Sequence, residues 1–408
     1  MGVILYSLVA FAAAIDGSGA SNSREIESDE NAKFGDLVSW VRMNGGRVDG
    51  RLGLTNHQHG GISVRGGVAL LPLEVGSELL FLPWKLVLGT IGENSTVPED
   101  KCEVLQYYAS EVEAGTGSFW YPYLAMDDSL SSIGRVPSLW DDLVISELQG
   151  LPPLMESTSG LTDWFSSNCA DGVPFLSLPR SNRQALLAAI TRAAGMRFLP
   201  IYDLLNHNNG MLNTESQACA KGVTITITRD VAKGQEVFMS YRGGKDSTVS
   251  DLFRRYGFVE SWPQYWTWAD DKEGLDASGG IQFLRLPHGV VTIFPPDSML
   301  SEIGLPGLFL NDFLATTQNH NQMISVERLI GFMRVGQDLI SSLATTTNED
   351  TVILLNLSHE LSQQSLNSIK SEQLSDLMSA VDYRMQFKES IQIAIDMAEK
   401  VLTLKSEL

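Results

Sequence analysis

The sequence is poor in cysteine and in basic residues. Its three cysteines, Cys102, Cys169 and Cys219, form no C-x-x-C pair and no Cys/His spacing typical of structural zinc, so free thiols are expected. The 29 Lys and Arg residues are outnumbered by 49 Asp and Glu residues, which gives a formal charge of −20. Because phosphate binding requires clustered basic side chains and none occurs, we expect no nucleic-acid partner.

Nucleotide-binding and metal-binding motifs are also missing. The glycines of "GGISVRGG" lack the Lys-Ser/Thr of a P-loop and the G-x-G-x-x-G spacing. His57 and His59 lie in "LTNHQHGG", which we interpret as a surface loop without a carboxylate or thiol close by. A metal ligand set normally needs such a partner, so no metal site is expected there.

The N-terminus has an apolar run over residues 3–15, which is too short to span a bilayer. It suits the core of a signal or organelle-targeting sequence, but the usual positively charged lead is missing, and an N-terminal helix or a disordered lead fits equally well. Residues 1–33 are predicted to be a leader and a polar linker. A plastid, secretory or cytoplasmic location remains open, and no stable membrane span is expected.

Hydrophobic periodicity divides the rest of the chain. It predicts a helix in "FGDLVSWVRM" that stops at Asn44-Gly45-Gly46, and two short paired strands within residues 60–83. Residues from about 90 to 195 are predicted to be mostly helical. Strands follow in "RFLPIYDLL", in residues 222–241 and in "IQFLRLPHGVVTIFPP", and helices return from about residue 298.

The stretch "RFLPIYDLLNHNNG", residues 197–210, gathers polar side chains behind an apolar run. Asp203, Asn206 and His207 offer several hydrogen-bond donors and acceptors that a small polar ligand could use. The alternative is an Asx turn in which Asn206 caps the next segment. The residues of this stretch alone leave both interpretations open.

Several segments, taken in order, resemble SET-domain protein methyltransferases of the branch that includes the Rubisco large-subunit lysine methyltransferase and the actin-histidine methyltransferase. They are "RGGVALLPLEVGSELLFLP", "GSFWYPYLAMDD", "TRA" with "LPIYDLLNH", and "RDVAKGQEVFMSY" with "YGF". The resemblance implies an α+β SET domain over residues 34–270, with a helical insert at about 90–195 and a knot-like core. It further implies an all-helical substrate-binding domain over residues 271–408.

The resemblance implies an S-adenosylmethionine-dependent protein-lysine N-methyltransferase whose C-terminal helical domain docks the protein substrate. A protein-histidine N-methyltransferase and a catalytically impaired SET-fold binding module remain alternatives. Tyr241 and Tyr256 match the family's catalytic positions. The positions that match cofactor-binding residues are Ser63, Val64, Arg65, Arg192, Asp203, Asn206, His207, Gly257 and Phe258.

The sequence departs from the family on the side that faces the substrate. Relatives read "S-Y-G-x-x-S-N-A-E" after the tyrosine, whereas "SYRGGKDSTVSDL" has two extra residues and places Thr248 or Val249 at the Asn. Ala194 replaces a Phe, and Ser63 replaces an acidic residue of the first cofactor loop. The identity of the substrate therefore stays open, and so does the binding-module alternative.

Overall fold

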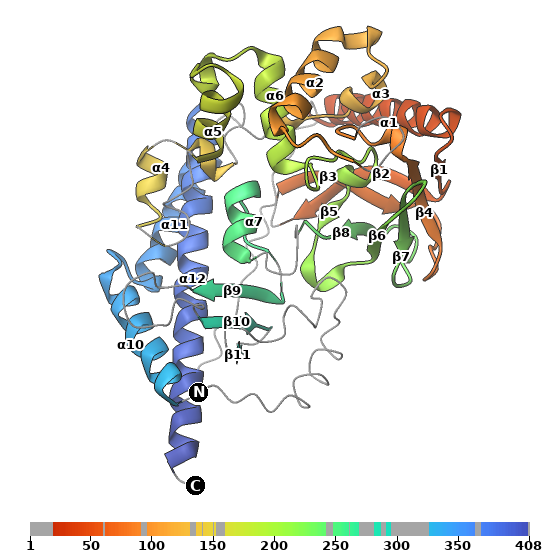
Figure 1. The fold of residues 1–408 in the computed structure, drawn as a ribbon. Coiled ribbons are helices and arrows are strands. Elements are labelled where there is room, and N and C mark those ends of the chain that lie inside the picture. The colour runs from red at the N-terminus through yellow and green to blue at the C-terminus, as the bar shows by residue number, and fades with distance from the viewer. Residues whose placement is uncertain are drawn as a thin grey trace.

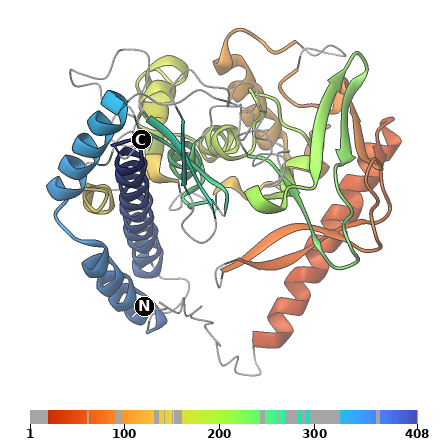
Figure 2. The same ribbon diagram turned by 90° about the horizontal axis from the view of Figure 1, so that it is seen from below.

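The computed structural model describes residues 19–59, 62–90, 96–130, 136–140, 142–149, 151, 160–241, 248–260, 262–268, 281–286, 291–294, 326–363 and 369–406. Most of the predicted leader lies outside these residues. In both views the two four-stranded sheets and the first helix lie on one side, and the three C-terminal helices lie on the other, with the three-stranded sheet beside the last helix (Figures 1 and 2).

The strands form three sheets. Their bounds are β1 (Arg47–Val48), β2 (Leu52–His59), β3 (Ile62–Ala69), β4 (Glu78–Pro83), β5 (Asn206–His207), β6 (Thr214–Cys219), β7 (Gly222–Ile227), β8 (Glu236–Met239), β9 (Gln264–Trp268), β10 (Ile281–Arg285) and β11 (Val291–Phe294). The sheet orders are β1-β4-β7-β6, β2-β3-β8-β5 and β11-β10-β9. Every pairing is antiparallel except β5 with β8, which run parallel.

The predicted strand at residues 222–241 is confirmed as β7, a turn and β8. The burial of β7 alternates: Val223, Ile225 and Ile227 are buried, and the threonines between them are half-buried. Side chains of a strand point alternately to its two faces, and here one face packs on the core. Gly234 turns the chain with a φ of +81°, a value that glycine adopts without strain.

Two strand predictions were wrong. The two strands predicted in residues 60–83 form, but β3 pairs with β2 and β8, whereas β4 pairs with β1 and β7. Their partners come from segments distant in sequence, which local patterning cannot specify. In "RFLPIYDLL" the backbone makes a 3-10 turn over Tyr202–Leu204 after Ile201, whose φ is +72°, so a strand begins only at Asn206.

The helices cover one edge of the sheets and build the second half of the molecule. Their bounds are α1 (Gly19–Met43), α2 (Lys101–Ala114), α3 (Tyr121–Leu124), α4 (Asp142–Ser146), α5 (Gly160–Cys169), α6 (Arg180–Thr191), α7 (Val249–Tyr256), α10 (Val326–Ser342), α11 (Thr347–Ser362) and α12 (Ile369–Ser406). None of the helices in the described ranges is long and apolar enough to cross a membrane.

Three helical predictions can be compared with these bounds. The helical character of residues 90–195 is confirmed by α2 to α6. Helix α1 stops at Met43 as predicted but begins at Gly19, so the polar stretch before Phe34 is partly helical rather than a linker. The C-terminal region is not all-helical, because β10 and β11 lie within residues 271–408 and pair with β9.

A disulfide joins Cys102 of α2 to Cys169 at the end of α5, with the two Cα atoms 5.3 Å apart. The expectation of free thiols was therefore wrong for these two cysteines and holds for Cys219, which is exposed. The partners are 67 residues apart in sequence, and only the packing of α2 against α5 brings them together.

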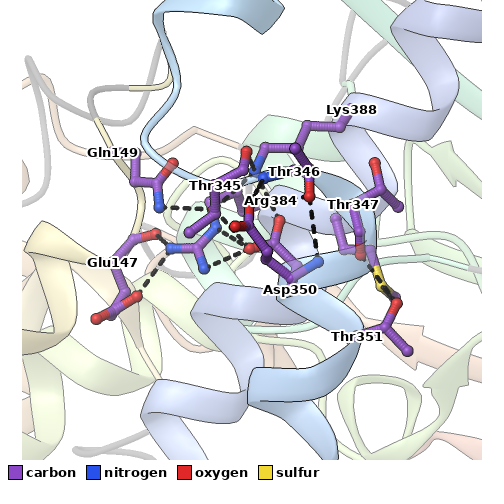
Figure 3. Close-up of polar contacts among 11 residues, drawn as sticks. Glu147, Gln149, Thr345, Thr346, Thr347, Asp350, Thr351, Arg384 and Lys388 are labelled. Carbon is purple, nitrogen blue, oxygen red and sulfur yellow. Dashed lines mark hydrogen bonds and ion pairs between the residues drawn. The ribbon is translucent and has the colours of Figure 1, made fainter.

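A buried ion cluster ties α12 to α11 and to the turn after α4 (Figure 3). The carboxylate of Asp350 receives Arg384 Nη2 and Lys388 Nζ, both at 2.7 Å, and Arg384 Nη1 lies 2.8 Å from Glu147 Oε2. Burial alone would raise the pKa of Asp350, but hydrogen bonds from Arg384, Lys388 and Thr345 outweigh it and hold that pKa below its usual value. Asp350 therefore stays charged and fixes the helix pair.

We expect Asp350→Asn to lower the free energy of unfolding by about 3–5 kcal/mol, because it leaves two buried cations with too little negative charge. Chemical denaturation followed by circular dichroism measures the change. Glu147→Gln is the matched control: that carboxylate is 37% exposed, and its loss should change stability by less than about 1 kcal/mol. Equal effects of the two substitutions would contradict this account.

Candidate active site

The centre of the site is β5, which pairs with β8 and contacts β3 through its side chains. Asn206 and His207 pair in parallel with Phe238 and Met239 of β8. The Asn206 amide nitrogen Nδ2 donates to the Arg65 carbonyl of β3 at 3.0 Å and to Glu236 Oε1 of β8 at 2.7 Å. Both facing atoms are acceptors, so the NH2 group must point toward them, and Asn206 links the two strands.

Two glycines of β3 make this contact possible. A Cβ atom on Gly66 would lie 2.4 Å from Asn206 Nδ2 and 2.5 Å from Glu236 Oε1. One on Gly67 would lie 2.3 Å from Leu205 Cδ2. Real Cβ contacts are essentially never so short, so a side chain at either position would force the Asn206, Glu236 or Leu205 side chain to move.

The His207 imidazole holds the chain around Tyr241. Its Nδ1 accepts from the Tyr241 backbone N–H at 3.2 Å, and its Nε2 lies 3.1 Å from Glu260 Oε2. The side chains of His207 and Glu260 are fully buried. Nδ1 also lies 3.3 Å from the Met239 carbonyl oxygen, so His207 contacts β8, the residue Tyr241 and Glu260 at once. Both ring nitrogens of His207 therefore already have partners within the protein.

Four rings surround the end of β8. The centroids of Tyr241 and Tyr256 are 4.6 Å apart, those of Tyr241 and His207 are 5.5 Å apart, and those of Tyr256 and Phe258 are 6.0 Å apart. The Tyr241 hydroxyl donates to the Leu205 carbonyl at 3.0 Å. We refer to His207, Tyr241, Tyr256 and Phe258 as the aromatic group.

Burial controls the ionisation of the two tyrosines. It raises the pKa of Tyr241 well above that of an ordinary phenol, and it raises the pKa of Tyr256 to about 12. Both phenols are therefore neutral near pH 7. They can donate or accept hydrogen bonds, but neither is available as a phenolate base.

Gly257 sets the positions of Tyr256 and Phe258. Helix α7 begins with a capping box between Thr248 and Asp251 and ends at Gly257, whose φ is +72°. The Gly257 N–H closes the helix on the Phe253 carbonyl at 2.7 Å. This left-handed C-cap, which glycine favours, carries the chain from one ring of the aromatic group to the next.

A charged cluster lies near the aromatic group and includes Asp203, which precedes β5. The Arg192 guanidinium contacts the carboxylates of Asp127 and Asp128 and donates from Nη1 to the Asp203 carbonyl at 3.0 Å. Arg65 Nη2 lies 3.3 Å from Asp128 Oδ2. Although burial alone would raise the pKa of Asp128, the charges of Arg192 and Arg65 outweigh it and hold that pKa below its usual value.

Asp203 differs from the other carboxylates of the site. Its Oδ2 accepts a hydrogen bond from the Tyr123 hydroxyl, but its buried Oδ1 has no hydrogen-bond partner among the described residues. Burial raises the pKa of Asp203 to about 7, despite the nearby charge of Arg192. A buried acceptor without a donor is costly unless a ligand or water satisfies it.

The structure brings most of the predicted site residues together. The aromatic group, Asn206, Arg65, Arg192 and Asp203 meet around β5, and Gly257 supports two of the rings. Ser63 and Val64 lie on β3 just before Arg65, with Ser63 exposed and Val64 half-buried, and within the described contacts neither side chain joins the clusters.

Four acidic residues of the site were not singled out from the sequence. They are Asp127, Asp128, Glu236 and Glu260. The sequence feature that could have indicated them is an acidic residue inside or next to an apolar motif, as in "GQEVFM" and "YGFVE". Such a residue costs free energy when buried unless it has a specific partner.

The interpretation of "LTNHQHGG" was wrong. His57 and His59 lie on β2, and both face the Glu236 carboxylate, with N···O distances of 3.4 and 3.0 Å. The carboxylate belongs to β8, 177 residues after His59 in sequence, so only the sheet brings it close. Within the described ranges, no group of His, Cys, Asp or Glu side chains has an arrangement suited to holding a metal ion.

Comparison with known proteins depends on structure alone. No family model matches the sequence, and no curated protein matches it. The structure of Rubisco LSMT bound to sinefungin and monomethyllysine is similar, with a TM-score of 0.55, 17% identity and 93% of each chain covered. Rubisco LSMT bound to AdoMet is similar with a TM-score of 0.54, 16% identity and coverage of 90% of this chain and 92% of the other.

A third similar structure is the SET domain of LSMT bound to lysine and AdoHcy. Its TM-score is 0.53 at 15% identity, and the alignment covers 90% of this chain and 91% of that one. These similarities extend over about nine tenths of the chain, and they show that it has the fold of the SET-domain LSMT structures. The mixed helix-and-sheet SET-domain fold expected from the sequence motifs is thereby confirmed, whereas the knot-like core and the C-terminal substrate-binding domain stay predictions.

The close contact between β5 and β3 can be tested with Gly66→Ala. We expect this substitution to separate β5 from β3, because the added methyl group would overlap Asn206 and Glu236, and to lower the melting temperature by several degrees or more. Gly53→Ala on β2 is the matched control, because its nearest atoms belong to the flexible, half-exposed Leu70 side chain. Thermal unfolding measures both, and similar shifts would contradict a close contact.

Proposed function

We propose that the protein is an S-adenosylmethionine-dependent protein-lysine N-methyltransferase. The observation that carries the proposal is the grouping of Asn206, Tyr241 and Tyr256 around β5 in a SET fold. The similar LSMT structures were solved with AdoMet, AdoHcy, lysine or methyllysine. At 15–17% identity those ligands support the reaction class and leave the substrate open.

The residues of the charged cluster fit the amino-acid end of this cofactor. The unpartnered Asp203 Oδ1 can accept a hydrogen bond from an ammonium group, and Arg65 and Arg192 can attract a carboxylate. Asn206 would contribute its amide oxygen, since its NH2 group is bound to Arg65 and Glu236. His207 would act through its backbone, because its imidazole is already bonded.

Tyr241 has the properties needed to orient the reacting groups. When bound, S-adenosylmethionine supplies a methyl group attached to a positively charged sulfur. Since the Tyr241 hydroxyl donates its proton to Leu205, the lone pairs of its oxygen remain as acceptors for polarised C–H groups. Tyr256 presents a ring beside it, which can attract a substrate ammonium by a cation–π contact before the proton leaves.

The neutral tyrosines restrict the path of the substrate proton. With both pKa values raised by burial, neither Tyr241 nor Tyr256 can take the proton from a lysine near pH 7. The amine must therefore lose its proton to solvent or on entering the apolar surroundings, where burial disfavours the charged form. The contribution of the protein is alignment of the amine and exclusion of water.

Protein-substrate docking is proposed for the C-terminal helical region, together with the division into residues 34–270 and 271–408. Support comes from α11, where Val352 and Leu355 are 56% and 58% exposed. They are three residues apart and therefore lie on one face of the helix. Exposed apolar side chains on one face suit contact with a protein rather than with a small solute.

Two experiments test the proposal. Calorimetric titration with S-adenosylmethionine should show binding, and absence of binding would exclude the enzyme. Incubation with labelled cofactor and a proteome lacking this protein should label a lysine, which mass spectrometry identifies. Labelled histidine would replace the lysine assignment by a histidine one, and binding without any labelled protein would indicate a SET-fold binding module.

Tyr241→Phe tests the role of the phenol. We expect turnover to fall on the order of a hundredfold, because the reacting groups lose their alignment. The dissociation constant of the cofactor should change by less than about threefold, since binding is assigned to other residues. Tyr121→Phe on α3 removes an exposed phenol and is the matched control.

The pH dependence of turnover separates two roles for Tyr241. Since its phenol stays neutral, Tyr241→Phe should lower the rate by the same factor at every pH from 7 to 9. A change in the shape of the pH–rate profile would mean that Tyr241 transfers the proton, and an unchanged rate would remove it from the mechanism.

A further inference from the structure

Two neighbouring aspartates follow α3, and both contact the Arg192 guanidinium. Arg192 Nε lies 3.3 Å from Asp127 Oδ1, and Arg192 Nη2 donates a hydrogen bond to Asp128 Oδ1. The two carboxylates differ in exposure, because the Asp127 side chain is fully buried and the Asp128 side chain is 50% exposed. The two contacts are therefore not equally easy to break.

The helical insert holds Asp127 in place. Asp127 Oδ2 accepts from the Tyr108 hydroxyl of α2 at 2.6 Å and from Gln184 Nε2 of α6 at 2.9 Å. Its Oδ1 accepts from the Ser129 backbone N–H at 2.8 Å. A buried carboxylate with this many donors is costly to move, because each broken contact leaves a polar group without a partner. Asp127 is thus a fixed anchor for Arg192.

Asp128 forms a bridge between two arginines. Its Oδ1 accepts from Arg192, and its Oδ2 lies 3.3 Å from Arg65 Nη2. Burial alone would raise the pKa of Asp128, but the charges of Arg192 and Arg65 hold that pKa below its usual value, so the bridge is ionic near pH 7. Because the Asp128 side chain is half-exposed, it also has a path to solvent.

Every nitrogen of the Arg192 guanidinium contacts a protein oxygen. Nε faces Asp127, Nη1 donates to the Asp203 carbonyl at 3.0 Å, and Nη2 donates to Asp128. Asp127 is anchored, and Asp203 contributes its main chain to this contact. A ligand carboxylate that approaches the guanidinium would be repelled by the charge of Asp128 and would need the same donors. Asp128 is therefore the partner that has to leave.

The two arginines need a carboxylate between them. The side chains of Arg65 and Arg192 are only 12% and 10% exposed, and two poorly solvated cations without a counter-ion are costly. Arg65 has one further acidic neighbour, Glu30, at 3.7 Å from Nη1, and its Nη2 donates to the Met126 carbonyl at 3.0 Å. Exchange of the Asp128 carboxylate for that of a ligand would leave the charge balance of the two arginines unchanged.

We propose that the Asp128 side chain occupies the place of the ligand carboxylate on Arg65 and Arg192, and that S-adenosylmethionine must displace it to bind. The proposal rests on the proposed function, because it assumes that these arginines bind the carboxylate of the cofactor. Asp128 is then an internal competitor. It lowers the affinity for the cofactor, and it keeps the two guanidinium groups paired when no ligand is bound.

The sign of the expected effect separates competition from structural support. Removal of a residue that only supports the site weakens ligand binding, whereas removal of a competitor strengthens it. We expect loss of the Asp128 carboxylate to tighten cofactor binding about fivefold, the factor for two partly exposed ion pairs.

The test is calorimetric titration of the full chain at pH 7.5 with S-adenosylmethionine and with decarboxylated S-adenosylmethionine, which lacks only the carboxylate. Asp128→Asn should bind S-adenosylmethionine about fivefold more tightly than the unsubstituted protein does, and the decarboxylated ligand no more tightly. Asp163→Asn removes an exposed carboxylate of α5 and is the matched control for net charge. It should change either dissociation constant by less than about twofold, because salt screens distant charges.

A second variant and kinetics provide further measurements. Asp128→Ala removes the acceptor as well as the charge, and it should tighten binding of S-adenosylmethionine at least as much as Asp128→Asn. In both variants kcat/KM for the cofactor should rise about fivefold. A loss of structure would instead lower kcat/KM and the melting temperature together, and this result in both variants would overturn the competition.

The remaining outcomes also decide. If S-adenosylmethionine binds the unsubstituted protein and binds Asp128→Asn equally or more weakly, the competition is overturned while the proposed function stands. If Asp128→Asn binds both ligands more tightly by the same factor, the ligand carboxylate is not involved, and the proposal is overturned as well. If neither protein binds the cofactor, the proposed function fails too. Binding by the variant alone would support the competition and the proposed function together.

Discussion

The side chains of β5 and of the residue before it pack directly on two glycines of β3, and the geometry of the site depends on this close approach. Gly66 and Gly67 admit Asn206 and Leu205 to within a distance that any side chain would block. Once β5 lies there, its carbonyl at Leu205 receives the Tyr241 hydroxyl, and the His207 imidazole receives the Tyr241 backbone N–H. The position of Tyr241 therefore depends on how closely β5 approaches β3.

The polar groups around β5 form a continuous chain of contacts. Arg65 contributes its carbonyl to Asn206 and its guanidinium to Asp128, and Asp128 in turn contacts Arg192. Strand β3, the helical insert and the turn before β5 are thereby linked through a few charge-assisted hydrogen bonds, which are stronger than neutral ones. A displacement of any one segment would be transmitted to the proposed cofactor site.

Sequence motifs predicted the SET-domain fold and the residues that meet around β5, whereas contacts between distant segments could not be predicted. Asn206, Tyr241 and Tyr256 were recognisable because each lies in a short motif with a characteristic order. Glu236 lies in the motif "GQEVFM", but its partners His57 and His59 come from a strand that was predicted to be a loop. The sequence also did not predict the Cys102–Cys169 disulfide or the separate partners of β3 and β4. The reason is the same, because pairing over long separations is decided by packing.

The strong negative charge of the chain raises the question of how a cationic cofactor and a cationic substrate would be distinguished from bulk cations. At the site most carboxylates already have partners: Asp127 and Asp128 contact Arg192, Glu236 lies 3.0 Å from His59, and Glu260 lies 3.1 Å from His207. Asp203 alone keeps a buried oxygen without a partner and a pKa near 7. A cation attracted by the overall charge would therefore find one acceptor at the site that no described donor satisfies, the Asp203 Oδ1 atom, close to an arginine that already has its own carboxylate partners.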